Sequence, residues 1–286
     1  MHTRLLTHTA IIGVALILFG AHLHGQQRTA PTKFETVKVK DDLYVLYNPG
    51  APGNITVQVT NEGVILVDAK DPHDYDNVVA AVKSITSQPI RYVINTHHHG
   101  DHTGSNPRLQ SAGAVVVASE NARQNMIESR FPGQPTITFE QRGNVILGGK
   151  KVELYYFGRG HTNGDIVAYF PANRALATGD LYVTGVGQLI DYAAGGNAKE
   201  WTRTLDGMLG LDFDVAIPGH GAVANKEDVR KFREFTVTLR SRVRELVVKK
   251  ATLEEVEQVM RTEFRWGNLH VARGLTGVMA EMREMP

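Results

Sequence analysis

The chain has 286 residues, of which 42% are hydrophobic and 21% are charged. Its 31 basic and 30 acidic residues leave a formal net charge of +1, and no basic tract favours a nucleic-acid partner. The absence of cysteine excludes disulfides and thiolate metal ligands, so the stability of the fold must come from packing.

The N-terminal segment, residues 1–25, is predicted to be a signal peptide. Arg4 supplies a positive charge, and residues 10–19 form an apolar stretch that is too short to span a bilayer comfortably as a helix. We therefore predict a periplasmic or secreted protein that meets the membrane only if this segment stays uncleaved as an anchor. Residues 26–36 are predicted to be a polar lead-in, and residues 37–286 the folded domain.

Short strands and turns are predicted at the start of this domain. Residues 37–47 alternate in part and end at a turn rich in Pro and Gly over residues 48–54. The alternating residues 55–59 and the apolar residues 64–67 flank Asn-Glu-Gly, which predicts a hairpin. Pro72 then marks the start of a helix that is predicted to end near residue 84.

Ligand-type side chains are concentrated directly after the next predicted strand, residues 91–95. They follow the pattern H-x-H-x-D-H: His97, His99, Asp101 and His102. In an extended chain the first two histidines point the same way, and Gly100 lets the backbone turn so that the following Asp and His diverge. Two imidazoles could then hold one cation while a carboxylate and an imidazole face a second. Zinc accepts these ligands in catalytic sites.

Three more side chains of this type occur later, each beside glycine and just after an apolar stretch: His161, Asp180 and His220. Ligands could project there from turns at the ends of strands. One such residue would mean little by itself, but the ordered set of seven predicts a metal site rather than a histidine-rich surface loop.

These motifs resemble those of metallo-β-lactamase superfamily hydrolases over about residues 44–221. The resemblance implies an α/β fold, a four-layered αβ/βα sandwich with two metal ions, expected to be Zn²⁺, at one edge of the paired sheets. It implies that three histidines bind the first ion: His97, His99 and His161. It implies three ligands for the second ion: Asp101, His102 and His220. Asp180 would bridge both ions. Asp at this place resembles the glyoxalase II and lactonase branches more than the dedicated zinc β-lactamases, which carry Cys or Ser.

The resemblance also suggests roles around the metals. Asp101 would orient the nucleophile, and Asp68 would hydrogen-bond a ligand or its loop from outside. Residues 48–54 are predicted as a substrate flap that equally suits an ordinary tight turn. The Gly-rich residues 182–196 could wall the cleft, with Tyr182 and Tyr192 as substrate contacts. Packing is the alternative for these tyrosines, and His98 and His270 are predicted to be structural.

The C-terminal part, residues 225–286, is predicted to be a helical extension. Apolar residues recur at helical spacing after residue 229, and Thr252 with Glu255 predicts a capped second helix. A third helix is predicted from about residue 269. These apolar stripes are expected to face the core, although such an extension could also cover the cleft or form a dimer face.

The predicted function is an exported dinuclear zinc hydrolase that attacks an ester, thioester, lactone or amide/β-lactam carbonyl of a small molecule. β-Lactams are possible main or side substrates. Iron or manganese would suit the same nitrogen and oxygen ligands. One alternative is a mononuclear iron persulfide dioxygenase, and another is an inactive relative that binds metal or a partner. The sequence makes no prediction of oligomeric state.

Overall fold

Two β-sheets form the centre of the structure, a computed structural model that describes residues 33–49 and 53–284. These residues belong to the compact unit that runs from Pro31 to Pro286. The predicted signal peptide, most of the lead-in and the middle of the predicted flap lie outside the described residues.

The first sheet has seven strands in chain order. They are β1 (Glu35–Lys40), β2 (Leu43–Tyr47), β3 (Ile55–Val59), β4 (Val64–Val67), β5 (Ile90–Ile94), β6 (Val115–Ser119) and β7 (Ile137–Phe139). β1 to β4 pair antiparallel, and β4 to β7 pair parallel. The partly alternating residues 37–47 do not form one element, because Asp41 and Asp42 turn the chain into a β1–β2 hairpin that begins within the predicted lead-in.

The second sheet has six strands in the order β13-β12-β11-β10-β9-β8. Its strands are β8 (Arg142–Leu147), β9 (Lys150–Tyr155), β10 (Val167–Phe170), β11 (Ala175–Ala177), β12 (Val215–Ile217) and β13 (Ala224–Asn225). β8 and β9 form the predicted hairpin, and Gly148 and Gly149 adopt φ values of 53° and 73° at its turn. Only β11 and β12 pair parallel in this sheet.

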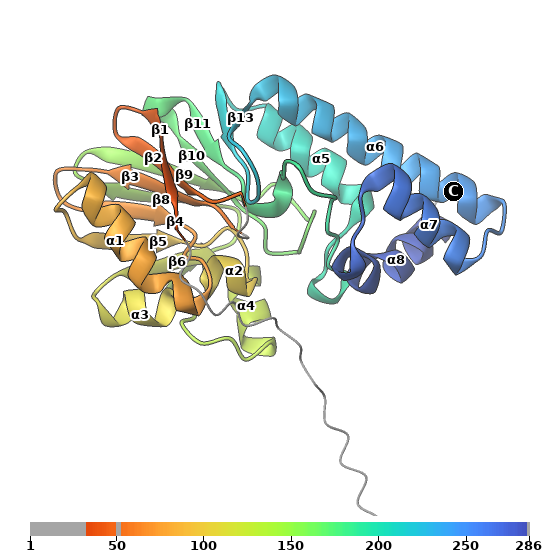
Figure 1. Ribbon diagram of the computed structural model, residues 1–286, viewed down its shortest axis with the longest axis horizontal. Coiled ribbons are helices and arrows are strands. Elements are labelled where there is room, and N and C mark those ends of the chain that lie inside the picture. The colour runs from red at the N-terminus through yellow and green to blue at the C-terminus, as the bar shows by residue number, and fades with distance from the viewer. Residues whose placement is uncertain (1–32, 50–52, 285–286) are drawn as a thin grey trace, which may run out of the picture. The chain divides into compact units, whose positions relative to one another are not determined.

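Helices cover the outer faces of both sheets, which gives four layers (Figure 1). β4 is buried on both faces. Ile65 and Val67 pack in the core between the sheets, whereas Val64 and Leu66 pack against the outer helices. Those outer helices are α1 (Tyr75–Ile85) and α3 (Asn106–Ser111), while α4 (Glu120–Glu128) follows β6. The α/β sandwich predicted from the resemblance is therefore confirmed.

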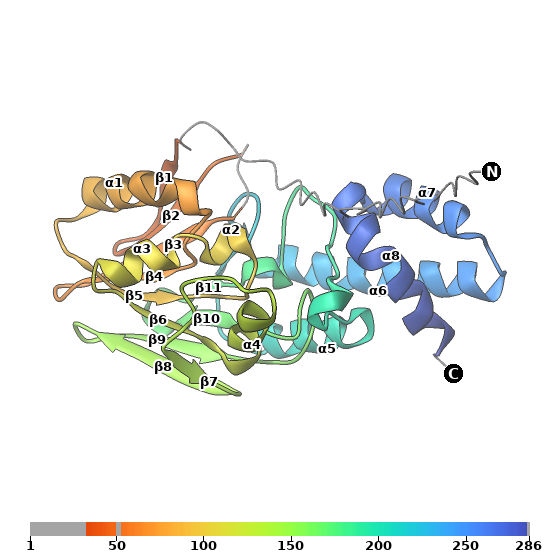
Figure 2. The same cartoon turned by 90° about the horizontal axis from the view of Figure 1, so that it is seen from below.

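The second sheet packs against α5 (Ala198–Leu209) and the C-terminal helices. These helices are α6 (Lys226–Val248), α7 (Leu253–Phe264) and α8 (Asn268–Arg283). Asn225 and Thr252 form capping boxes with Asp228 and Glu255, which begins α6 and α7 close to where the sequence predicts. Figure 1 and Figure 2 both show α6, α7 and α8 together beyond the second sheet.

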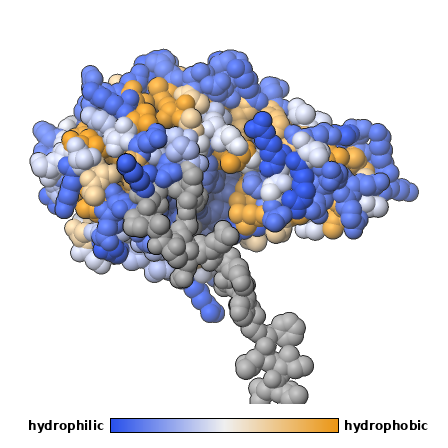
Figure 3. All heavy atoms as spheres, viewed as in Figure 1, coloured by the Kyte–Doolittle hydropathy of each residue, from blue (hydrophilic) through white to orange (hydrophobic). Residues whose placement is uncertain are grey.

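In the described part of the chain, four 3₁₀ helices occur in the connections: η1 (Pro72–Asp74), η2 (Pro171–Asn173), η3 (Gly179–Leu181) and η4 (Tyr192–Ala194). The face seen in Figure 3 is largely hydrophilic, and its hydrophobic side chains form separate patches. Within residues 33–49 and 53–284, no helix is long and apolar enough to cross a membrane.

Candidate metal centre

The predicted ligands all follow strands and meet at one edge of the two sheets. The H-x-H-x-D-H segment runs from the end of β5 into α2 (Gly100–Thr103), so Gly100 begins a short helix instead of a simple turn. His161 lies between β9 and β10, Asp180 lies in η3 after β11, and His220 follows β12. Residues far apart in the sequence therefore reach one place because neighbouring strands end there.

Three histidine nitrogens form the first group of the site. His99 Nδ1 lies 3.1 Å from His97 Nε2 and 2.9 Å from His161 Nε2. All three residues are buried, and their ligand atoms could hold one metal ion. The structure therefore brings together the residues that the resemblance implied for the first metal.

Hydrogen bonds on the far side of each ring place the protons away from this group. His161 Nδ1 lies 2.7 Å from the Leu189 carbonyl, which can only accept, so this nitrogen carries the proton. His99 Nε2 lies 2.9 Å from a carboxylate oxygen of Asp191 and is a donor for the same reason. The inward nitrogens of these rings then carry lone pairs. A cation placed among these nitrogens could accept all of these lone pairs.

A second group lies beside the first, and Asp180 belongs to both. His220 Nε2 is 3.3 Å from Asp101 Oδ2 and 3.2 Å from Asp180 Oδ2. His102 Nε2 is 3.4 Å from Asp101 Oδ2 and from Asp180 Oδ1. Asp180 Oδ2 also lies 3.5 Å from His161 Nε2 of the first group. Asp180 is therefore placed where a carboxylate could contact two metal ions.

Two buried atoms of the second group lack any hydrogen-bond partner: His102 Nε2 and Asp180 Oδ1. Buried polar atoms are rarely left unpaired, because the desolvation penalty is then not offset. A metal ion would satisfy both atoms at once. The donor set of imidazole nitrogens and carboxylate oxygens therefore fits zinc.

Asp68 supports the site from outside the two groups. Its Oδ2 lies 2.8 Å from His102 Nδ1, and its Oδ1 accepts a hydrogen bond of 2.8 Å from the backbone N–H of Thr96. Thr96 Oγ also donates to Asp68 Oδ2, so the same hydroxyl can accept from His97 Nδ1 at 3.1 Å. One carboxylate thereby orients a histidine in each group.

The electrostatics of the site favour the metal-binding forms of His97, His161 and Asp180. Burial lowers the pKa of His161 to about 4 and the pKa of His97 well below its ordinary value, so both rings are neutral at pH 7. Burial raises the pKa of Asp180, but the charges of His220 and His102 outweigh burial and lower the pKa below its ordinary value. Asp180 is therefore an ionised carboxylate.

A cavity of about 290 Å³ opens beside the two groups. His99, Asp101, Asp180 and His220 form its polar side. Its other side is mainly apolar and comes from residues 182–196, from Phe131 after α4, and from α8. The apolar side chains are Phe131, Val183, Val186, Leu189 and Leu269, and His270 and Arg273 complete the wall from α8. Residues 182–196 thus lie at the cavity, as the sequence suggested.

The two predicted tyrosine contacts need correction. Tyr182 is 2% exposed and packs edge-on against Phe232, with ring centroids 5.1 Å apart. The hydroxyl of Tyr192 donates to Glu281 at 2.6 Å, and its ring packs against the C-terminal helices. Neither lines the cavity beside the metal ligands. Both tyrosines have packing roles, because the apolar interior between residues 182–196 and the C-terminal helices takes up their rings.

Several residues at the site were missed by sequence reasoning. Asp191 follows apolar Leu189-Ile190, as the predicted ligands follow apolar stretches, and that signal could have found it. Arg273 donates to Asp191, and no sequence pattern in α8 marks it as a residue of the site. His270, predicted as structural, lies 3.0 Å from the Gly187 carbonyl through Nε2 and also lines the cavity. His98 is buried and stacks on Phe131.

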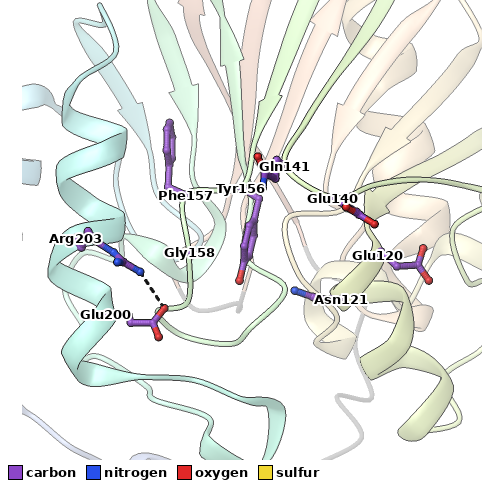
Figure 4. A pocket seen from close by; sticks show the side chains of 9 residues that line it. All are labelled: Glu120, Asn121, Glu140, Gln141, Tyr156, Phe157, Gly158, Glu200 and Arg203. Atoms are coloured by element: carbon purple, nitrogen blue, oxygen red, sulfur yellow. Dashed lines mark ion pairs between the residues drawn. The ribbon is translucent and has the colours of Figure 1, made fainter.

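A second cavity, of about 510 Å³, contains none of these ligands (Figure 4). Glu120, Asn121, Tyr156 and Arg203 are among its lining residues, and Arg203 pairs with Glu200 at 3.5 Å. Burial raises the pKa of Tyr156 above its ordinary value. This cavity lacks the convergent metal ligands that the smaller one has.

The structure therefore defines a two-sheet α/β sandwich with His/Asp groups at its edge that could hold metal ions. The family profile described as the Metallo-beta-lactamase superfamily matches residues 48–220, and the chain belongs to this superfamily. The prediction made from the motifs is confirmed.

Two kinds of relative are similar in sequence. A metallo-beta-lactamase type 2 from Bacillus sp. is 28% identical over 199 residues, which is 67% of this chain and 76% of that protein. A hydroxyacylglutathione hydrolase from a Synechococcus species is 35% identical over 156 residues, 51% of this chain and 56% of that protein. The chain is thus similar to both a β-lactamase and another hydrolase of the superfamily.

Solved structures share the fold. A metallo-beta-lactamase from Pontibacter korlensis superposes with a TM-score of 0.64 at 23% identity, over 71% of this chain and 99% of that one. The DIM-1 metallo-beta-lactamase gives a TM-score of 0.63 at 20% identity, over 72% of this chain and 98% of that one. At these identities the likeness concerns the sandwich and not the substrate.

Proposed function

We propose that the protein is an exported hydrolase that uses two zinc ions to cleave an ester, thioester, lactone or amide bond, including the β-lactam, in a small molecule. The convergence of inward-facing imidazole nitrogens and carboxylate oxygens carries this proposal. In particular, His102 Nε2 and Asp180 Oδ1 are buried without any partner, although both could bind metal. Zinc at such a site supplies a hydroxide nucleophile near neutral pH and polarises a carbonyl oxygen.

The chain's own residues would bind and orient the reactants. Asp101 lies on the cavity wall next to His220, so its carboxylate can accept a hydrogen bond from the attacking nucleophile and orient it. Asp180 holds a negative charge between the two groups. No serine or cysteine nucleophile is required by this arrangement.

The apolar wall would bind the acyl or leaving group of the substrate. Val186 and Leu269 are 50% and 53% exposed, so apolar surface at the cavity is available for burial by a ligand. The volume of about 290 Å³ suits a small molecule and is too small for a folded partner.

The type of bond that the protein cleaves is best determined by comparing its initial rates on different substrates. Asp180 favours a general hydrolase, while the similarity to a metallo-beta-lactamase type 2 favours a β-lactam substrate. Protein lacking residues 1–25 would be loaded with zinc and its metal content measured. Initial rates would then be recorded with a chromogenic cephalosporin, a lactone and a hydroxyacylglutathione, each with a chelated control and an Asp101→Asn control.

Chelator-sensitive turnover of any one substrate, lost in Asp101→Asn, is the expected result. Turnover of the cephalosporin alone would make the protein a β-lactamase despite Asp180. Protein that holds no zinc, or that holds two zinc ions and turns over none of the three substrates, would contradict the proposal. Export is tested separately, by locating the processed chain in the periplasmic fraction and sequencing its N-terminus.

A further inference from the structure

A hydrogen-bonded chain connects the C-terminal helix α8 to a ligand of the first group. Arg273 Nη1 donates to Asp191 Oδ2 at 2.8 Å, and the same oxygen lies 2.9 Å from His99 Nε2. The three residues come from α8, from residues 182–196 and from the H-x-H-x-D-H segment. Contacts between residues so far apart in the chain form only in the folded protein.

The Asp191 carboxylate is held in place on every side. The residue is 4% exposed, and its Oδ1 accepts a weak hydrogen bond of 3.4 Å from the backbone N–H of Ala194, the last residue of η4. Its backbone N–H donates 2.9 Å to the carbonyl of His161, another ligand of the first group. Its position is therefore coupled to the metal centre through both backbone and side chain.

The positive charge of Arg273 beside His99 disfavours the metal-binding tautomer of His99, and Asp191 counteracts this effect. Arg273 Nη1 lies only 2.9 Å from His99 Nε2, and a guanidinium can donate but never accept. Without a carboxylate beside it, this cation would favour the form of His99 in which Nε2 accepts. That form carries its proton on Nδ1, the nitrogen that faces His97 and His161, and could not bind a metal ion there.

We infer that Asp191 is a positioning residue that keeps the proton of His99 on Nε2, and that Arg273 of α8 holds Asp191 in place for this role. The inference rests on the proposed function, because it concerns the zinc that the first group would bind. It adds a part of the C-terminal extension to the metal centre, and it assigns the extension a contribution to metal affinity beyond covering the sheet.

The test measures zinc affinity and not activity. The proteins compared are the parent, Asp191→Ala, Arg273→Met and the double variant, each lacking residues 1–25. Their zinc affinities would be measured by competition with a chromogenic chelator. We expect Asp191→Ala to lower the affinity for one of the two zinc ions roughly 10- to 100-fold and to leave the affinity for the other unchanged. Arg273→Met alone should lower the affinity for that zinc ion only a few-fold. The double variant should recover part of the affinity that Asp191→Ala loses, because the opposing cation is gone.

Asp206 and Arg233 provide a matched control. They form an Asp–Arg pair of the same kind, at 2.8 Å between α5 and α6, away from the ligands. Asp206→Ala and Arg233→Met should bind zinc like the parent. Equal affinity in Asp191→Ala and the parent, or an equal loss in Asp206→Ala, would overturn the inference.

A measurement on the parent protein covers the case in which Asp191→Ala does not fold. Nitrogen-15 NMR of the imidazole rings reports which nitrogen of His99 carries the proton. A proton on Nε2 is expected in the metal-free parent, and a proton on Nδ1 would overturn the inference. A parent protein that binds no zinc at all would instead contradict the proposed function, so the two failures are distinguishable.

Discussion

Asp68 Oδ2 lies 2.8 Å from His102 Nδ1, and the same carboxylate accepts from both the backbone N–H and the hydroxyl of Thr96. Asp68 adopts a φ of 67°, in the left-handed region that Asp and Asn tolerate better than most residues. Backbone conformation and side-chain contacts thus agree in presenting this carboxylate to the metal centre.

Asp68→Asn should weaken zinc binding. Asn keeps the backbone conformation, but its amide can no longer accept from Thr96 and His102 on both sides. We expect one zinc ion to bind roughly 10- to 100-fold more weakly. Chelator competition measures the change, and Asp41→Asn, at an exposed carboxylate, is the control. Unchanged affinity would show that Asp68 serves the fold alone.

Asp180→Asn should remove one metal ion. The Oδ2 atom of Asp180 lies 3.5 Å from His161 Nε2 and 3.2 Å from His220 Nε2, so its negative charge serves both groups. Zinc content by elemental analysis should fall from about two ions per chain to about one. Turnover should fall by more than the roughly 10- to 100-fold typical of outer partners. Two tightly bound ions in the variant would contradict the bridging role.

Charges at the cavity mouth should impair binding of apolar substrates without unfolding the protein. Val186→Asp and Leu269→Asp place a carboxylate on a wall that is mainly apolar. Both positions are about half exposed, so the free energy of unfolding should change by no more than about 0.5 kcal/mol. KM should rise about tenfold. Ile146→Asp, at a residue 64% exposed on β8, is the matched control and should leave KM unchanged.

Asp165 should make the stability of the metal-free protein depend on pH. Burial raises the pKa of Asp165 from 3.8 to about 7, against hydrogen bonds from Thr162 that lower it. The folded protein therefore keeps this proton at pH values where the unfolded chain has lost it. The resulting stabilisation is fully present below pH 4 and is lost as pH rises through 7.

Asp165→Asn mimics the protonated acid and should remove this dependence. Relative to the variant, the parent should lose on the order of 4 kcal/mol of unfolding free energy between pH 4 and pH 8. Urea unfolding of chelator-treated protein, followed by circular dichroism at several pH values, measures the difference. A difference that stays constant over this range would show that Asp165 is ionised in the folded protein.

Local patterns predicted many elements because their causes are local. Gly148-Gly149 requires a turn, and the capping residues Asn225 and Thr252 satisfy backbone groups within their own first helical turns. The β1–β2 hairpin was not predicted, for a related reason. A partly alternating pattern does not show whether two adjacent Asp residues continue a strand or turn it, and pairing with β3 decides this.

The sequence by itself predicted the seven candidate ligands and determined the superfamily, because ligand chemistry and spacing at strand ends are written in short motifs. Tertiary structure decided the surroundings. Asp191 and Arg273 are 82 residues apart, and Arg273 lies 174 residues from His99, so no local period could connect them. The burial of Tyr182 depends likewise on Phe232 in α6. A ligand is recognised by its own chemistry, whereas a supporting residue is defined only by what the fold places beside it.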